Sequence, residues 1–252
     1  MNKKSEKIQQ EFIIKSFSDE NTLSEYSKDT FNIGLWETEK AMFTKYFAKD
    51  ARILDIGCGA GRTTLGLYWL GFKNIVGVDI TPGMIKEAKS NAKKVGIEIH
   101  FEVGDACSLA YEDNSFNGCL FSFNGIMQIP TRANRVIALK EIKRVMKKGG
   151  IFIFTTHDRE LAEEWKWFWD EETARWEKGE QDQRIFEFGD RIVEENGRLI
   201  FIHFPDREEV LQCIEESGME LMDEAWVSEL VEETDAVKKR ISKCKFWVVK
   251  KI

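Results

Sequence analysis

Three glycines follow a short apolar run near residue 55. The stretch ILDIGCGAG, residues 53–61, places Gly57, Gly59 and Gly61 at every second position after the acid Asp55. Glycine tolerates positive φ and leaves no Cβ between the backbone and a ligand. The helix expected after Gly61 would direct its free N–H groups at that ligand. The loop therefore indicates an anionic or polar, nucleotide-like ligand, although an ordinary glycine-rich turn has the same pattern.

Two further acids end the next two predicted strands. Asp79 follows the loop by roughly 20 residues, the separation at which a carboxylate binds ribose hydroxyls in dinucleotide-type folds. Asp105 ends the strand after that. The carboxyl ends of parallel strands meet at one edge of a sheet, where open α/β folds bind ligands. The pattern consists of a glycine loop after one strand and an acid at the end of each of the next two strands. It is more specific than the loop or either acid alone.

The segment that must position these residues alternates between strands and helices. Apolar runs predict five strands, at residues 52–57, 74–80, 97–105, 116–124 and 151–156. These runs are apolar on both faces and alternate with amphipathic segments, which favours a parallel sheet covered by helices. Thr81 and Thr131 are expected to begin two of the helices, and Gly71, Gly96 and Gly149 are expected to end three of them.

The pattern changes after Thr156. Residues 158–183 are charged, rich in tryptophan and predicted to be helical, and residues 184–204 read as a hairpin that turns at Asn196-Gly197. A helix that ends at Gly218 and two closing strands follow. The first fifty residues are predicted to form helices and loops.

These elements predict an α/β protein with a doubly wound, Rossmann-like sheet. We expect a mostly parallel, seven-stranded sheet with helices on both faces. We expect an N-terminal helical cap over residues 1–50 and the main domain over residues 51–252. A helix and hairpin lid is expected to be inserted in that domain at about 158–204.

With these motifs assembled, the sequence resembles the class I S-adenosylmethionine-dependent methyltransferases. ILDIGCGAG resembles their first motif, with GxGxG spacing instead of the GxGxxG of dinucleotide binders, while VGVDIT and VGDACSLAY resemble the second and third. FNGCLFSFNGIMQIP and EIKRVMKKGGIFIF resemble the segments around the fourth and fifth strands. The resemblance covers residues 51–156 and extends to the later strands by topology only. It implies S-adenosylmethionine as the cofactor.

The resemblance also implies roles for the residues of the loop. Gly57, Gly59 and Gly61 would lie under the methionine part of the cofactor, together with Cys58. Asp55 would order the loop and the cofactor's amino group.

Residues at the next three strand ends receive roles in the same way. Asp79 would bind the ribose hydroxyls, and Ile80 would pack on the adenine face. Asp105 would accept a hydrogen bond from the adenine amino group, with Ala106 beside it. Phe121 would lie near the methionine moiety through its carbonyl.

The chain departs from the family pattern at two places. Asn117 replaces the usual Asp, which we expect to affect packing only. Met127 and Gln128 lie where relatives often carry His, which puts a histidine-based scheme at that position in doubt.

The acceptor site is less well defined by the sequence. Tyr26 and Trp36 are candidates for one wall, and Asn124 and His157 for the edge of the sheet. The tryptophans of the insertion would form an aromatic lid, or would pack a flap onto the sheet or a second subunit. His157 is the candidate general base, with a structural role as the alternative, so the catalytic residue stays unassigned.

Composition restricts the partners and the compartment. A formal charge of −7 and a pI near 5.3 disfavour nucleic acid. Five cysteines without a CxxC pair suggest reduced thiols in a cytoplasmic protein, and neither a secretory signal nor a membrane-spanning stretch is evident. No His, Cys or Asp spacing resembles a metal site. We expect a monomer or a homodimer.

The function that fits these observations is methyl transfer from S-adenosylmethionine to a small-molecule acceptor. An RNA-modifying methyltransferase shares the fold but would be expected to carry a basic strip at the mouth of the site. A non-catalytic S-adenosylmethionine-binding regulatory protein is the second alternative. An NAD-dependent oxidoreductase is disfavoured by the GxGxG spacing.

Overall fold

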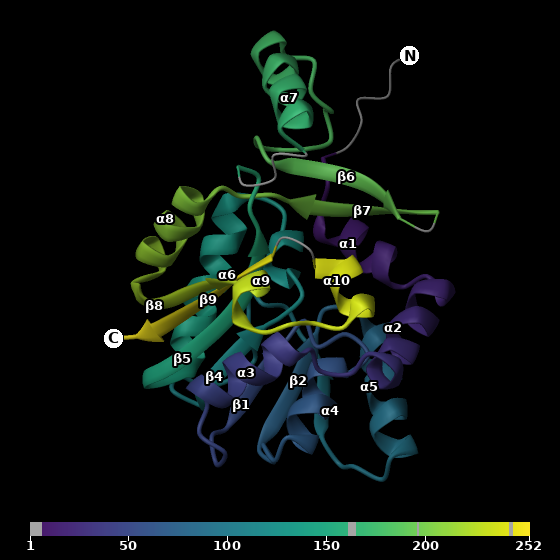
Figure 1. Cartoon of the computed structure of the whole chain (residues 1–252), viewed down its shortest axis with the longest axis vertical. Coiled ribbons are helices and arrows are strands. Elements are labelled where there is room, and N and C mark those ends of the chain that lie inside the picture. The colour runs from purple at the N-terminus through teal and green to yellow at the C-terminus, as the bar shows by residue number, and fades with distance from the viewer. Residues whose placement is uncertain (1–6, 161–164, 196, 242–243) are drawn as a thin grey trace.

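A single, mostly parallel sheet forms the centre of the protein (Figure 1). The computed structural model describes residues 7–160, 165–195, 197–241 and 244–252. The strands of the sheet are β1 (Ile53–Ile56), β2 (Ile75–Asp79), β3 (His100–Val103), β4 (Phe116–Phe121), β5 (Met146–His157), β8 (Met219–Trp226) and β9 (Cys244–Lys251). Their order is β3-β2-β1-β4-β5-β9-β8. Strands β1 to β5 are parallel, and β9 is antiparallel to both of its neighbours, so the predicted fold class is confirmed.

Helices cover both faces of this sheet. They are α1 (Gln10–Phe17), α2 (Glu20–Asn32), α3 (Glu37–Tyr46), α4 (Arg62–Trp69), α5 (Pro82–Lys94), α6 (Arg132–Val145), α8 (Arg207–Ser217), α9 (Val227–Leu230) and α10 (Asp235–Ile241). Alternate strand residues face opposite sides. Leu54 and Phe152 join the core beneath α6 and α8, while Ile53 and Ile153 join the core beneath α3 and α4. None of the helices that the structure describes combines the length and the apolar character needed to cross a membrane.

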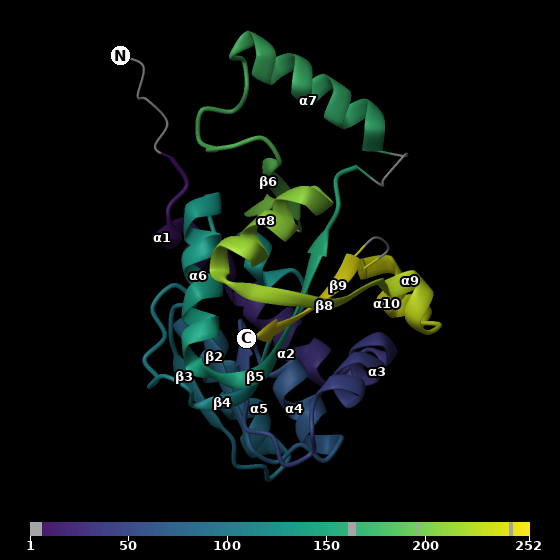
Figure 2. The same ribbon diagram turned by 90° about the vertical axis from the view of Figure 1, so that its left-hand side faces the viewer.

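The insertion after β5 forms a helix and a hairpin. Helix α7 (Lys166–Lys178) precedes the antiparallel pair β6 (Asp190–Glu195) and β7 (Arg198–His203). Figure 2 shows α7 standing clear of the sheet, on the far side of the hairpin, and no residue of α7 is buried. The predicted hairpin is confirmed, but Asn196 of its predicted turn lies outside the described residues.

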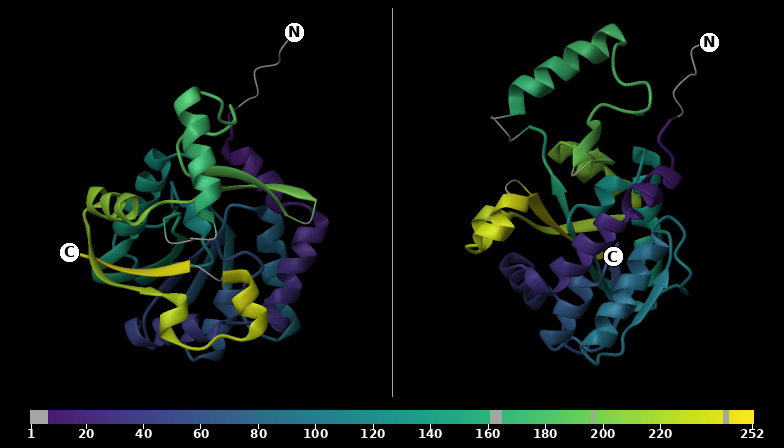
Figure 3. Two further views of the ribbon diagram at one scale, coloured as in Figure 1. Left: turned by 45° about the horizontal axis from the view of Figure 1, so that its top comes forward. Right: turned by 90° about the vertical axis from the view of Figure 1, so that its right-hand side faces the viewer.

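The N-terminal segment is tied to this insertion. The N–H of Ile8 donates to the carbonyl of Arg184 at 2.9 Å, and the hydroxyl of Ser16 donates to the carbonyl of Leu199 at 2.7 Å. Figure 3 shows the N-terminal helices running along the side of the domain below the hairpin. The N-terminal segment and the insertion, which are far apart in the sequence, therefore contact each other directly.

The predicted end of the helix at Gly149 is wrong. Helix α6 ends at Val145, and β5 begins at Met146, which pairs with Phe116 of β4. Both Val145 and Met146 are fully buried, so the chain enters the sheet four residues earlier than the glycine pattern indicates. The register against β4 shifts just before Ile151, and the positive φ of Gly149 (78°) serves this irregular stretch of the strand instead of a helix end.

Gly66 lets the N-terminal cap approach α4. A Cβ at this position would lie 2.1 Å from Cδ1 of Leu35 and 2.8 Å from its Cγ. We predict that Gly66→Ala lowers the free energy of unfolding by about 1–3 kcal/mol, because a buried leucine must be displaced. Chemical denaturation followed by circular dichroism measures the change. In a Leu35→Ala background the same substitution should be neutral or stabilising, and an equal loss in both backgrounds would contradict this assignment.

Candidate functional site

The glycine loop lies between β1 and α4, and its three glycines have different roles. Gly57 has a φ of 63°, and a Cβ there would lie 2.4 Å from the ring of Phe121. Gly59 has a φ of 53°, and a Cβ there would touch the ring of Tyr26 at 3.4 Å. Gly61 has a φ of 90° and is the N-cap of α4. Gly57 and Gly59 line a cavity, whereas Gly61 shapes the entry into the helix.

Asp79 holds this loop in place. Its Oδ2 accepts a hydrogen bond from the N–H of Gly59 at 2.9 Å, and its Oδ1 accepts one from the N–H of Thr81 at 2.8 Å. Burial raises the pKa of the Asp79 carboxyl, and these backbone hydrogen bonds oppose the rise. The Thr81 side chain also donates to this carboxylate, which has about four lone-pair positions, so acceptor capacity remains for a hydroxyl donor in the cavity.

Asp105 faces the same cavity from the end of β3. Its Oδ1 accepts from the N–H of Cys107 at 2.8 Å, and its Oδ2 accepts from Nε2 of Gln10 at 2.7 Å. Gln10 begins α1, so the N-terminal cap reaches the carboxylate that the sequence assigns to an adenine amino group. Ile80 and Ala106 line the cavity beside the two acids.

The cavity has a volume of about 440 Å³. Asp79 and Asp105 are the two carboxylates among the described residues of its lining, and none of those residues is a Lys, Arg, His or Glu. Its apolar side chains come from the cap, the sheet edge, α5, the segment before α6, and the insertion: Ile8, Ile13, Phe17, Ile56, Met84, Phe121, Phe123, Ile129 and Phe186. The lining therefore combines two carboxylates at strand ends with apolar side chains and with uncharged polar ones, which come from Gln9, Gln10, Thr81, Ser122, Gln128, Thr131 and Asn134. This mixture suits an uncharged ligand surface that is partly polar.

Asp55 lies beneath the loop and is almost fully buried. Its Oδ2 accepts hydrogen bonds from the hydroxyls of Thr63 and Thr64 at 2.5 and 2.6 Å. Its Oδ1 is buried and has no hydrogen-bond partner among the described residues. Burial raises the pKa of Asp55 to about 7, although the two threonine hydroxyls oppose the rise. Asp55 orders the loop from below and leaves one acceptor atom available.

A buried ion pair joins the N-terminal cap to the loop. Glu39 of α3 is fully buried, and its carboxylate accepts two hydrogen bonds from the guanidinium of Arg62, at 2.6 and 2.7 Å. The hydroxyl of Ser122 donates to the same carboxylate. The Arg62 guanidinium also lies 4.6 Å from the ring of Trp36. The sequence analysis missed this pair, although a Glu at the third position of a helix is a capping-box signal.

The candidate acceptor residues separate into two groups. Tyr26 lines the large cavity and, with Trp36 and Cys58, a smaller one of about 50 Å³ beside it. Asn124 and His157 line neither cavity. They contact each other, with Nδ2 of Asn124 at 3.1 Å from Nε2 of His157.

His157 has two further contacts. Its Nδ1 lies 3.6 Å from Sγ of Cys244, and its ring stacks on Phe204 with centroids 5.1 Å apart. The geometry thus gives His157 a packed environment behind the cavity wall.

The tryptophans of the insertion do not line the cavity. Trp165 and Trp167 are exposed by 45% and 58%, and Trp169 packs on Phe188 and Phe204. Phe186, which the sequence analysis did not single out, is the residue of the insertion that reaches the cavity.

The raised pKa of Asp55 predicts a pH dependence of stability. The unfolded carboxyl ionises near pH 3.9, so between about pH 4 and pH 7 the folded protein holds a proton that the unfolded chain has lost. This group therefore makes stability fall as the pH rises through that range. Asp55→Asn should flatten this part of the curve of unfolding free energy against pH. Asp50→Asn, at an exposed position, is the control, and an unchanged slope in Asp55→Asn would contradict the shift.

Comparison with known proteins identifies a family from the sequence. Residues 47–190 match the family described as a methyltransferase domain. A demethylmenaquinone methyltransferase of Staphylococcus haemolyticus is 31% identical over 142 residues, which cover 53% of this chain and 56% of the relative. The chain spans about half the length of the curated relatives it matches.

Solved structures share the fold over most of the chain. An S-adenosylmethionine-dependent methyltransferase of Methanosarcina mazei has a TM-score of 0.67 and 20% identity, covering 87% of this chain and 99% of its own. The [4+2]-cyclase SpnF has a TM-score of 0.69 and 17% identity, covering 98% of each chain. The fold is thus shared by proteins with different reactions, whereas the family match rests on the sequence itself. The chain therefore belongs to the methyltransferase domain family and has the fold of the S-adenosylmethionine-dependent methyltransferases.

Proposed function

We propose that the protein transfers a methyl group from S-adenosylmethionine to a small, uncharged and largely apolar acceptor. The observation that carries this proposal is the cavity at the carboxyl edge of the sheet, in which Asp79 and Asp105 are the charged side chains among the described residues and the others are apolar or uncharged polar. When bound, the cofactor supplies a methyl group that is already electrophilic. The protein has to align the acceptor with that methyl group and exclude water.

The cofactor end of the cavity has the donors and acceptors that a nucleoside requires. The remaining acceptor capacity of Asp79 suits a ribose hydroxyl, and Ile80 offers an apolar surface beside it. Asp105 suits an amino group as a hydrogen-bond donor. Oδ2 of Asp105 can accept that bond beside the one from Gln10, or in place of it. The unpartnered Oδ1 of Asp55 lies beneath the glycine loop, where an amino group or a water would satisfy it. The residues present therefore fit the cofactor.

The rest of the lining favours an acceptor without charge. A charged acceptor would lose its hydration without gaining an ion pair from the described lining, which contains no basic side chain and whose two acids we assign to the nucleoside end. The lining also favours an acceptor whose nucleophilic atom carries no proton or loses its proton readily. Such an atom needs no general base, because a base is required only when the nucleophile holds its proton tightly. The insertion, at about 158–204, is proposed to cover the acceptor through Phe186.

Cofactor selectivity tests the first part of the proposal. S-adenosylmethionine and S-adenosylhomocysteine should bind with dissociation constants in about the micromolar range, and NAD should not bind. Asp79→Ala should weaken binding roughly ten- to a hundred-fold, because hydrogen bonds to a charged group are lost. Calorimetry measures both effects, with the exposed Asp50→Ala as the control. Equal binding of NAD, or an unchanged affinity in Asp79→Ala, would contradict the assignment.

Transfer of a labelled methyl group tests the second part. Incubation with methyl-labelled S-adenosylmethionine and a metabolite extract should give a labelled product of low polarity. Phe186→Ala should keep cofactor affinity within a few-fold and reduce transfer if the insertion covers the acceptor, because Phe186 is the described residue of the insertion in the lining. Labelled RNA would support an RNA methyltransferase instead, and cofactor binding without any labelled product would support a regulatory protein.

A further inference from the structure

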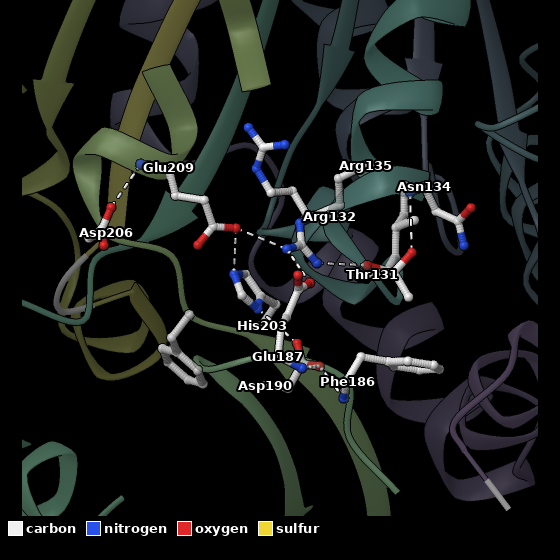
Figure 4. Close-up of polar contacts among 12 residues, drawn as sticks. Thr131, Arg132, Asn134, Arg135, Phe186, Glu187, Asp190, His203, Asp206 and Glu209 are labelled. Atoms are coloured by element: carbon white, nitrogen blue, oxygen red, sulfur yellow. Dashed lines mark hydrogen bonds and ion pairs between the residues drawn. The ribbon is translucent and has the colours of Figure 1, made fainter. Parts of the chain in front are cut away.

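His203 lies between two carboxylates at the centre of a buried polar network (Figure 4). Its ring is fully buried, with Nδ1 at 2.8 Å from Oδ1 of Asp190 and Nε2 at 2.8 Å from Oε1 of Glu209. Burial raises the pKa of Glu209, but the hydrogen bond and charge of His203 and the charge of Arg135 outweigh it and bring the pKa to about 2. An ionised carboxylate only accepts hydrogen bonds, so both ring nitrogens donate and the imidazole carries a positive charge.

One arm of this network reaches the cavity through Asp190. Its Oδ2 accepts hydrogen bonds from the backbone N–H groups of Phe186 and Glu187, at 2.9 and 3.1 Å. Phe186 belongs to the cavity lining. The carboxylate that binds His203 therefore also fixes the backbone that presents Phe186.

The other arm reaches the cavity through Glu209 and Arg135. The Arg135 guanidinium is almost fully buried, and its Nη2 donates to Oε1 of Glu209 at 2.9 Å and to Oε1 of Glu187 at 2.6 Å. Its Nη1 donates to the carbonyl of Ile129 at 3.2 Å, and Ile129 is also part of the lining. His203 thus connects two segments of the cavity wall that are far apart in the sequence.

The carboxylates of the network outnumber its guanidinium groups. Arg159 contacts Glu209 at 3.3 Å and forms an ion pair with Asp206. Counted with these, the network holds the carboxylates of Glu187, Asp190, Asp206 and Glu209 against the guanidinium groups of Arg135 and Arg159. Without a charge on His203, two negative charges in a largely buried region would be uncompensated, and that arrangement is costly.

The same residues do not form a convincing metal site. Ligand atoms of Glu187, Asp190 and His203 lie within 4.8 Å of one another, which is close enough for a shared cation. However, both oxygens of Asp190 already accept hydrogen bonds, and the Arg135 guanidinium already donates to Oε1 of Glu187. A guanidinium at 2.6 Å would repel a divalent cation in that position.

We propose that His203 is a positioning residue: its imidazolium bridges Asp190 and Glu209 and thereby fixes Phe186 and Ile129 in the wall of the cavity. The consequence for ligand binding rests on the proposed function, whereas the effect on the backbone does not. Loss of the charge should release the 186–187 backbone and loosen this side of the cavity.

Hydrogen exchange at the Phe186 and Glu187 amides tests this role directly. In His203→Gln, protection corrected for intrinsic exchange should be at least about ten-fold lower than in the wild-type protein. His100→Gln, at an exposed position on β3, is the matched control and should behave as the wild type.

The outcomes distinguish the alternatives. Unchanged protection in a folded His203→Gln protein would overturn the proposal. If His203→Gln does not fold, Glu209→Gln removes the carboxylate that faces Nε2 and should also lower this protection, and unchanged protection in that variant would overturn the proposal. Protection that appears only with added zinc would overturn it in favour of a metal site. Affinity for S-adenosylhomocysteine should fall in His203→Gln, and if neither protein binds this ligand while the exchange result holds, the proposed function fails and the positioning role stands.

Discussion

The hydrogen bond from the Gly59 N–H to the Asp79 carboxylate, at 2.9 Å, fixes the geometry on which the cavity depends. It ties the loop after β1 to the end of β2, and the N–H of Cys58 adds a second link to the carbonyl of Val78 at 3.0 Å. The loop can follow this path only because Gly57 and Gly59 adopt positive φ without a Cβ. One carboxylate therefore serves two purposes, since it shapes the loop and still presents free acceptor positions to the cavity.

The walls above this edge come from segments outside the doubly wound core. The cap contributes Gln10, Ile13 and Phe17, and the insertion contributes Phe186. These two segments hold each other by backbone hydrogen bonds, and they are anchored to the core by separate buried ion networks, one centred on Glu39 and one on His203. The division matches the chemistry that we propose, because the core would hold the cofactor while the added segments select the acceptor.

The sequence was most informative where a local pattern determines structure. The glycine spacing and the acids Asp79 and Asp105 predicted which strand ends face the cavity, because the carboxyl ends of parallel strands must meet at one edge. The end of α6 was mispredicted because a glycine with positive φ fits an irregular strand as well as a helix end, and the burial of Val145 decides between them.

Contacts between distant segments were not accessible in this way. Glu39 and Arg62 are 23 residues apart, and Gln10 and Asp105 are 95 apart, so no spacing rule connects them. The two carboxylates that contact His203 come from β6 and α8 and are brought together only by tertiary packing. The aromatic content of the insertion suggested a tryptophan lid, whereas a phenylalanine reaches the cavity.

The isolation of α7 has a consequence for how unfolding of this protein is observed. Four of the eight tryptophans, Trp165, Trp167, Trp169 and Trp176, belong to the insertion. A helix without buried residues can detach at a much smaller free energy than the sheet requires. Intrinsic fluorescence therefore reports a local event as strongly as the global transition, whereas far-ultraviolet circular dichroism is dominated by the domain. Non-coincident transitions from the two signals would reflect the architecture of the chain and not a folding intermediate of the sheet.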